Sequence, residues 1–477
     1  LRYRYLDKRS AMGCTGIYHL CSRRMDNRKG FFYICITVFI LILLHRHICH
    51  QQARMAHARA DGSPNSVEFD IGMTRVVHIT DFVDDLVHFK SRIYTQVEHT
   101  KLFVYAAIAR NMSTPWDEFG VTAWIHSGVD PKNASCCFLY SDGVLRITNA
   151  WRYSVFMKPE IYVIRFQCAN PIPGSKPNGM TLAVSGFACS SNISTYVKPL
   201  YPLRPHGNVT IAICTKQAYG NLDPNLVVEW LEYNINMGVD KVITFVDASN
   251  LIQNTSEILR YYQKMGFVDI IPYDLPMRDV IPRIPGAKIT ISYSDSLAAI
   301  HYCEDQLAGY SFVAVADFDE FIFPRKHADI KQLMVYLSEI YPDVGVFTFK
   351  TEIYITSWGK INENGHLILT QYSNRTEAIM DRVKNMLIPQ RIQPGAVTTH
   401  TAKPRSGYRR IVIPKDIAVI NHYRKCILKS TKECYGFTDF SRITDFSMSK
   451  RLSQVMINKV SLYDQILLSK ELWHLKD

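Results

Sequence analysis

The chain has 477 residues, of which 47% are hydrophobic and 21% are charged, values that are ordinary for a folded globular protein. Its formal net charge is +12, but residues 1–60 alone carry +9, through eleven Lys or Arg and two Asp or Glu. The rest of the chain is nearly neutral, which excludes the extended basic surface of a nucleic-acid-binding protein. We therefore predict no nucleic-acid partner, and the length accommodates about two to three domains.

The N-terminal residues predict a membrane anchor. Residues 1–30 form a basic tail, and the run at 31–44 is apolar. Positive charge before an apolar segment favours a cytosolic N-terminus. The run is short for a membrane span, so a cleaved signal peptide is the alternative, but the small-residue pattern Ala58-Arg59-Ala60 lies too far downstream for cleavage. We predict an uncleaved type II signal anchor, followed by a polar stem at residues 45–66.

Sequons and cysteines indicate that the chain beyond the anchor is luminal. Six N-x-S/T sequons follow the predicted anchor and none precedes it: Asn111, Asn133, Asn192, Asn208, Asn254 and Asn374. Such sequons are acceptors for N-glycosylation in secreted proteins. Eight cysteines lie beyond the predicted stem, from Cys136 to Cys434, and no CxxC spacing among them suggests zinc. We expect disulfides formed in an oxidising lumen, with the connectivity left open.

Residues 67–205 are predicted to form a small β-rich domain. Apolar and polar residues alternate over short runs at 121–126, 136–140 and 161–168, and turn residues separate these runs. Three prolines then mark residues 198–207 as a linker.

Residues 206–477 are predicted to form an α/β domain. Asp223 followed by Pro224 predicts the start of a helix, and Gly238 predicts its end. A strand at 241–246 is expected to end at Asp247. The other expected elements are strands at 209–215, 268–272 and 311–316 and helices at 256–265 and 292–307. This alternation is typical of a mostly parallel sheet, in which ligands bind beyond the carboxyl ends of the strands.

The segment Phe312–Pro324 reads FVAVADFDEFIFP and places three carboxylates at the end of an apolar run. Clustered carboxylates that lose hydration repel one another, so a cation would stabilise them. Asp317 and Asp319 have DxD spacing, and their hard oxygen ligands suit Mn²⁺ or Mg²⁺, which commonly carry a substrate diphosphate. The alternative is a solvated acidic turn after a core strand.

Four segments together resemble glycosyltransferase family 92: YGNLDPNLVVEWLEYNINMGVDKVITFVDAS, VDIIPYDLP, AVADFDEFIFP and INHYRKC. The resemblance covers about residues 208–440. It implies a GT-A-like, Rossmann-like glycosyltransferase domain after the β-rich domain. It also implies an inverting transfer of a hexose such as galactose from a UDP-sugar to a glycoprotein or glycolipid glycan. The implied cofactor is Mn²⁺ or Mg²⁺, and the implied location is the Golgi membrane.

Three residues are the candidate metal ligands. Asp319 is expected to contact the metal directly, and Asp317 to do so through water or to hold the ribose. A further ligand is expected from far along the chain. His422 lies in VINHYR after a strand-like run and matches the family's HYR motif. His400 is the alternative ligand. The alternative interpretation of His422 is that it is a surface histidine after a strand, with no role in metal binding.

Other residues are assigned to the donor and to proton transfer. Asp247 is expected to hold uracil or ribose unless it caps a helix, and Lys384 and Arg424 are expected near the diphosphate. An inverting transfer also needs a base for the acceptor hydroxyl. Glu320 and Glu352 are the candidates for this base. The alternatives are that Glu320 only forms a hydrogen bond within the acidic loop and that Glu352 is only a charge at a strand edge.

Two other functions fit part of this pattern. A metal-dependent luminal hydrolase could use the same carboxylates, but it would not need the α/β region that precedes the DxD motif. A catalytically silent glycan-binding or scaffold protein could keep the same fold, and loss of a DxD aspartate would have supported it, yet both are present. The sequence therefore favours a membrane-anchored glycosyltransferase.

Overall fold

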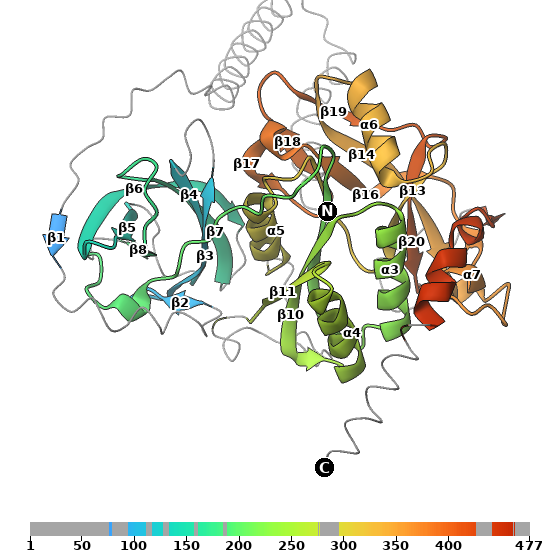
Figure 1. Ribbon diagram of the computed structural model, residues 1–477, viewed down its shortest axis with the longest axis horizontal. Helices are drawn as coiled ribbons and strands as arrows, with labels where there is room; N and C mark the ends of the chain where they lie inside the picture. Colours follow the sequence, from blue (N-terminus) through green and yellow to red (C-terminus); the bar gives the residue numbers. More distant parts are fainter. Residues whose placement is uncertain are drawn as a thin grey trace, which may run out of the picture. The chain divides into compact units, whose positions relative to one another are not determined.

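The computed structural model describes residues 76–78, 94–110, 117–126, 133–156, 161–184, 188–274, 276, 295–425, 441–460 and 462 (Figure 1). The predicted tail, anchor and stem lie outside these residues, as do Asn111, Cys426 and Cys434. None of the helices among the described residues has the length and apolar character that a membrane crossing needs.

An antiparallel sheet forms from the strands between residues 76 and 183, in the order β2-β3-β4-β7-β6-β5-β8 with β1 beside β6. Its strands are β1 (Val76–His78), β2 (Thr95–Gln96), β3 (Leu102–Arg110), β4 (Glu118–His126), β5 (Ser135–Leu139), β6 (Val144–Phe156), β7 (Ile161–Ala169) and β8 (Gly179–Ala183). The long strand β6 pairs first with β5 and then with β7, so the sheet folds over a core that includes Phe119, Phe138 and Phe166. The strands agree with the predicted β-rich character. A separate domain ending at residue 205 stays a prediction, because residues 71–477 form one unit.

In the described part of the chain, a second sheet has 11 strands. They are β9 (Ile211–Gly220), β10 (Lys241–Leu251), β11 (Val268–Pro272), β12 (Phe312–Val315), β13 (Glu320–Pro324), β14 (Val344–Ile355), β15 (Asn374–Arg375), β16 (Ile379–Leu387), β19 (Arg409–Val412), β20 (Ala418–Arg424) and β21 (Ile443–Thr444). The strands β11, β10, β9 and β12 are parallel. Beyond β12 the sheet is mixed: the pairs β12–β16, β14–β16 and β13–β20 are antiparallel, whereas β14 pairs in parallel with β19 and β20. The expectation of a mostly parallel sheet therefore holds for the strands from β11 to β12 and not for the rest of the sheet.

Helices cover both faces of the parallel half (Figure 1). The helices are α3 (Pro224–Asn236), α4 (Gln253–Lys264), α5 (Asp295–Gln306), α6 (Ile330–Ile340) and α7 (Ile368–Gln371), with short turns η2 (Ile193–Thr195), η3 (Thr356–Trp358), η4 (Pro389–Arg391) and η6 (Met448–Arg451) and a ribbon of β17 (Ile392–Val397) and β18 (Ala402–Pro404). Alternate residues of β9 show why helices pack on both faces of the parallel strands. Ile211 and Ile213 pack in the core shared with α3 and α4, whereas Ala212 and Cys214 pack with α5.

Helix α3 follows the predicted signals and positions β13. Asp223 caps it by accepting a hydrogen bond from the Asn225 N–H (2.9 Å), and Pro224 occupies its first turn. On its buried face, Trp230 Nε1 donates to the Glu320 carbonyl (2.8 Å) and Tyr233 Oη donates to the Ile322 carbonyl (2.8 Å). These two bonds fix the strand that begins with Glu320.

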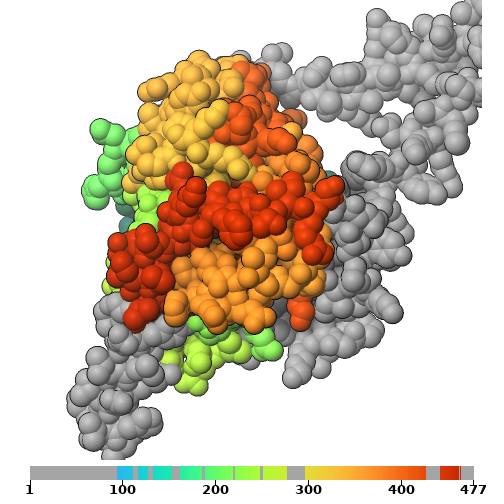
Figure 2. Space-filling model, turned by 90° about the vertical axis from the view of Figure 1, so that its right-hand side faces the viewer, coloured from blue at the N-terminus to red at the C-terminus, as the bar shows by residue number. Residues whose placement is uncertain are grey.

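The described residues 441–460, coloured red, run across one face of the molecule between parts of the chain coloured orange and yellow (Figure 2). They contact α3 through two side chains. Asn458 Nδ2 donates to Glu232 (2.6 Å), and Lys459 Nζ pairs with the fully buried Glu229 (2.8 Å). Glu229 also accepts the N–H groups of Ile368 and Leu369 at the start of α7. The C-terminal segment therefore helps to hold α3, and through it β13.

Helix α5 lies between the two sheets, in contact with β9 and with β3, β4 and β7 (Figure 1). Arg165 of β7 is 1% exposed and binds Glu304 (2.6 Å) and Asp305 (2.5 Å) of α5. Arg110 of β3 also pairs with Asp305 (3.1 Å). A side chain at Gly120 would collide with the Asp305 carboxylate, so the contact requires glycine there. A buried ionic network therefore joins α5 to the antiparallel sheet.

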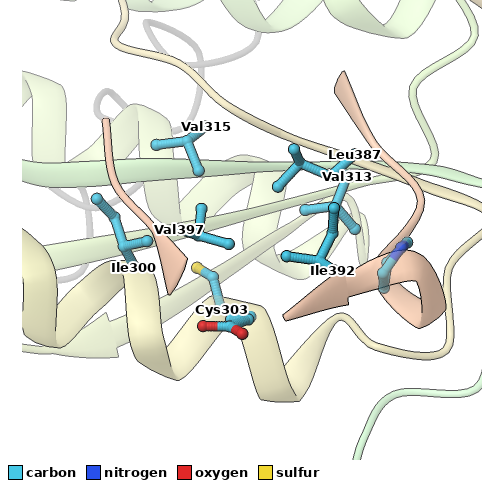
Figure 3. Close-up of a pocket in the computed structure, with 9 residues that line it drawn as sticks. Ile300, Cys303, Val313, Val315, Leu387, Ile392 and Val397 are labelled. Carbon is cyan, nitrogen blue, oxygen red and sulfur yellow. The ribbon is translucent and has the colours of Figure 1, made fainter. Parts of the chain in front are cut away.

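Three disulfides lie among the described residues: Cys136–Cys168, Cys137–Cys189 and Cys214–Cys303. The first joins β5 to β7, the second joins β5 to the loop between β8 and η2, and the third joins β9 to α5. A cavity of about 20 Å³ lies beside this third bridge, with Ile300, Val313, Val315, Leu387, Ile392 and Val397 around Cys303 (Figure 3). Such a volume holds about one water, so this cavity, which is lined mostly by apolar side chains together with Glu304, is a packing gap and not a ligand site.

The predicted glycosylation sites differ in accessibility. The exposed sequon asparagines are Asn133, Asn192, Asn208 and Asn254. Asn374 is 9% exposed, and its Oδ1 accepts a hydrogen bond from Thr444 (3.0 Å) in β21. We expect glycans at the four exposed sites and none at Asn374, because a glycan there would displace β21. Peptide mass spectrometry before and after glycosidase F measures occupancy, and a largely occupied Asn374 would contradict the pairing of β15 with β21.

Candidate active site

The carboxyl ends of the parallel strands bring polar residues to one edge of the mixed sheet. Lys216 lies within β9, two residues after the part that pairs with β12, and Asp317 follows β12 by two residues. Asp247 is 6% exposed and lies within β10, which continues to Leu251 instead of ending at residue 246 as predicted. Ligands of open α/β sheets bind at this edge.

A turn after β12 creates the acidic cluster. The Glu320 N–H donates to the Asp317 carbonyl (3.1 Å), and the Asp317 N–H donates to Glu320 Oε2 (2.8 Å). Glu320 then begins β13, where it stands directly opposite His422 of β20. The Tyr423 N–H donates to the Asp319 carbonyl (2.8 Å) and holds the turn against β20. Residues about a hundred positions apart are thus joined by strand pairing.

Asp319, Glu320 and His422 form a group that could hold a metal ion, with one ligand atom from each lying within 4.8 Å of the others. His422 Nε2 lies 3.3 Å from Asp319 Oδ2, and its Nδ1 lies 3.6 Å from Glu320 Oε1. Burial would lower the pKa of His422, but Asp319 and Glu320 raise it. Two carboxylates and an imidazole fit a divalent ion such as Mn²⁺. The structure therefore groups the predicted Asp319 and His422 with Glu320, which was predicted as a base.

Asp317 lies among lysines instead. Its Oδ2 pairs with Lys216 (2.8 Å) and lies 3.5 Å from Lys384. Burial raises the pKa of Asp317, but Lys384 and Lys216 offset this and lower it to about 2. Lys216 was missing from the sequence prediction. The signal was its position directly after the apolar run at 209–215, which includes the part of β9 that pairs with β12.

Lys384 of β16 is 1% exposed and forms an ion pair with Glu320 Oε2 (2.7 Å). Burial would lower the pKa of Lys384, but Glu320 and Asp317 raise it, so the ammonium stays charged. Burial raises the pKa of Glu320 itself, against the attraction of Lys384. A buried ammonium beside the candidate metal ligands can neutralise anionic charge without competing for a metal position.

Glu352 is not brought to this cluster. In β14 it stands opposite Asn421, whereas Ile353 stands opposite His422. Because successive side chains of a strand point to opposite faces, Glu352 lies on the face opposite His422 and Glu320. There it pairs with Arg325 (2.6 Å) and Arg375 (3.2 Å). Burial raises its pKa, and the two arginines counter that rise.

Arg424 and His400 come near the cluster from two different elements of the fold. Arg424 ends β20 two residues after His422, and therefore on the same face of the strand. His400 lies in the turn between β17 and β18, and its Nδ1 is 3.0 Å from the Val383 carbonyl, next to Lys384. Its contacts are with the lysine side of the site, so the structure does not group it with Asp319, Glu320 and His422.

The sequence pattern of glycosyltransferase family 92 matches residues 209–456, which is more than half of the chain and includes the whole acidic cluster. The chain belongs to glycosyltransferase family 92. Members of this family transfer sugars, so the acidic cluster is the candidate active site of a family 92 glycosyltransferase.

Relatives of this family 92 chain match only part of it. The β-1,4-galactosyltransferase galt-1 of Caenorhabditis elegans is 27% identical over 116 residues, which are 24% of this chain and 25% of the relative. A UDP-glucose pyrophosphorylase complexed with UDP-glucose is 12% identical, with 53% of this chain and 100% of that chain covered at a TM-score of 0.22. The bifunctional glycosyltransferase WbbM is 12% identical over 32% of this chain and 26% of its own, at a TM-score of 0.19. Such low scores carry no argument about the fold.

Proposed function

We propose that this family 92 chain transfers galactose, with inversion, from UDP-galactose to a glycan of a glycoprotein or glycolipid. The observation that carries the proposal is the convergence of Asp319, Glu320 and His422 beside Lys216 and Lys384 at the carboxyl edge of the parallel strands. The partial similarity to a β-1,4-galactosyltransferase supports galactose as the sugar. A GT-A-like arrangement of the sheet and helices is part of the proposal.

The residues of the site have distinct roles in this proposal. Asp319, Glu320 and His422 would hold a divalent ion, Mn²⁺ or Mg²⁺, which when bound supplies positive charge to the leaving diphosphate. Lys216, which already pairs with Asp317, would exchange that partner for a phosphate oxygen. Lys384, which pairs with Glu320, would offset part of the negative charge of the cluster, and Arg424 would contact the diphosphate from the end of β20. Asp247 would hold the uracil or ribose. Fixed charges of this kind stabilise a developing anion without reorganising.

We also propose that the enzyme is a type II protein of the Golgi membrane with its catalytic region in the lumen. The basic tail before the apolar run at 31–44, the exposed sequons and the disulfides support this topology.

The test of this function is release of UDP from a panel of UDP-sugars in the presence of Mn²⁺ and glycan acceptors. We expect UDP-galactose to be the best donor and release to depend on an acceptor. Release from another UDP-sugar would correct the donor and keep the class of reaction. Glycan binding without release from any donor would instead support the catalytically silent alternative.

A further inference from the structure

The structure leaves the base of the reaction unassigned, because neither predicted carboxylate is suitably placed. Glu320 is 3% exposed and lies between Lys384 and His422, so an acceptor sugar cannot reach it. Glu352 points to the opposite face of the sheet and is held by two arginines. A base must lie within hydrogen-bond reach of the hydroxyl from which it takes the proton.

His400, unlike these two residues, has a proton-accepting atom that no other group in the described part of the chain holds. Its Nδ1 is 3.0 Å from the Val383 carbonyl, and a carbonyl only accepts, so Nδ1 carries the proton. In the neutral ring this leaves the lone pair on Nε2, which has no hydrogen-bond partner among the described residues. The side chain is half-buried, and it lies close enough to Lys384, Lys216 and Asp317 of the site for their charges to act on its ring.

The turn that carries His400 is held by its own hydrogen bonds. The Thr398 N–H donates to the Thr401 carbonyl (2.7 Å), and the Thr401 N–H donates to Thr398 Oγ1 (3.0 Å). The His400 N–H also approaches Thr398 Oγ1 (3.4 Å). These bonds fix the backbone of His400, and the contact with Val383 fixes the orientation of its imidazole ring.

Burial and the positive charge of two lysines keep the ring of His400 neutral. The charged groups that act on the ring are Lys384 from β16, Lys216 from β9 and Asp317 after β12. Burial first, and then the positive charge of Lys384, lower the pKa of His400 to about 4, and Asp317 only partly opposes this. The ring is therefore unprotonated at neutral pH, as a base must be before reaction.

We propose that His400 Nε2 accepts the proton of the acceptor hydroxyl in the transfer reaction. This inference rests on the proposed function. In the step, the acceptor O–H bond breaks, its proton goes to Nε2, and its oxygen forms a bond to the anomeric carbon of the donor. The bond from that carbon to the nucleoside diphosphate breaks at the same time, and its electron pair leaves on the diphosphate. The imidazolium then returns its proton to water.

The test compares His400→Gln with the wild-type chain. Glutamine offers an amide oxygen as hydrogen-bond acceptor but cannot take the proton. We expect kcat to fall on the order of 10²-fold, as for loss of a general base. The dissociation constants of UDP and of Mn²⁺, measured by titration calorimetry, should not change. In His400→Ala, added imidazole should restore part of kcat, and the matched control His206→Gln, at an exposed histidine, should retain wild-type kcat.

Three outcomes would overturn the role of His400. They are a wild-type kcat in His400→Gln, loss of UDP or Mn²⁺ binding in that variant, or no recovery of His400→Ala by imidazole. A wild-type chain that releases no UDP would contradict the proposed function itself. An active wild type with an equally active His400→Gln would contradict only this inference.

Discussion

Replacing Asp319 with Asn is expected to reduce turnover of the UDP-sugar by about 10²–10³-fold, the usual effect of losing one preorganised electrostatic contact in an active site. Asp319 Oδ2 lies 3.3 Å from His422 Nε2 and belongs to the group that could hold a divalent ion. The amide keeps the size of the carboxylate but removes its charge, so the diphosphate would lose part of its compensation.

The folded state should tolerate Asp319→Asn, because the substitution removes one of several neighbouring negative charges. We expect the thermal melting temperature to stay at or above that of the wild type. Asp343→Asn is the matched control, because Asp343 is exposed. Within the described residues its side chain pairs with Arg409 alone. Turnover equal to wild type in Asp319→Asn would remove this residue from the reaction. A collapsed melting temperature with proportionate loss of activity would make its role structural.

Replacing Arg165 with Met is expected to destabilise the fold by about 3–5 kcal/mol, the usual cost of removing one partner of a buried ion pair. Arg165 is 1% exposed and neutralises both Glu304 and Asp305. Burial would lower its pKa, but Asp305 and Glu304 raise it, so the guanidinium is charged in the folded protein. Methionine would leave two carboxylates without this cation. Arg110 forms ion pairs with Asp305 and Glu118, so it cannot replace Arg165 as the partner of Glu304.

Urea unfolding of the Arg165→Met variant measures this change. Arg409→Met serves as the control, because the Arg409–Asp343 pair lies at the surface, where screening leaves such pairs little influence. We expect a clearly lower unfolding midpoint for Arg165→Met and no measurable change for Arg409→Met. An Arg165→Met variant with the wild-type midpoint would show that the network between α5 and the antiparallel sheet does not stabilise the fold.

Local signals in the sequence predicted the elements that local chemistry decides. Asp223 and Pro224 start α3 as expected, because capping depends on neighbouring residues. The apolar run before Asp317 forms a buried strand, which the apolar character of its own residues already predicts. The acidic segment could therefore be placed at a strand end without knowledge of the sheet.

The remaining features depend on strand register, which adjacent residues do not specify. Glu352 looked like a candidate base, but its pairing with Asn421 turns it to the other face of the sheet. Glu320 joined His422 only because the two stand opposite each other in β13 and β20. The position of His400 beside Val383 likewise follows from a turn that meets a distant strand. Such long-range pairings decide which residues share a face.

The measurement that tests the central claim most directly is transfer of galactose from UDP-galactose by enzyme freed of metal with EDTA, followed by addition of Mn²⁺. The proposed site predicts almost no transfer in EDTA, full recovery with Mn²⁺, and no comparable recovery when His422 is replaced by Ala. Full transfer in EDTA, or a His422→Ala variant that responds to Mn²⁺ as the wild type does, would contradict a metal site formed by Asp319, Glu320 and His422.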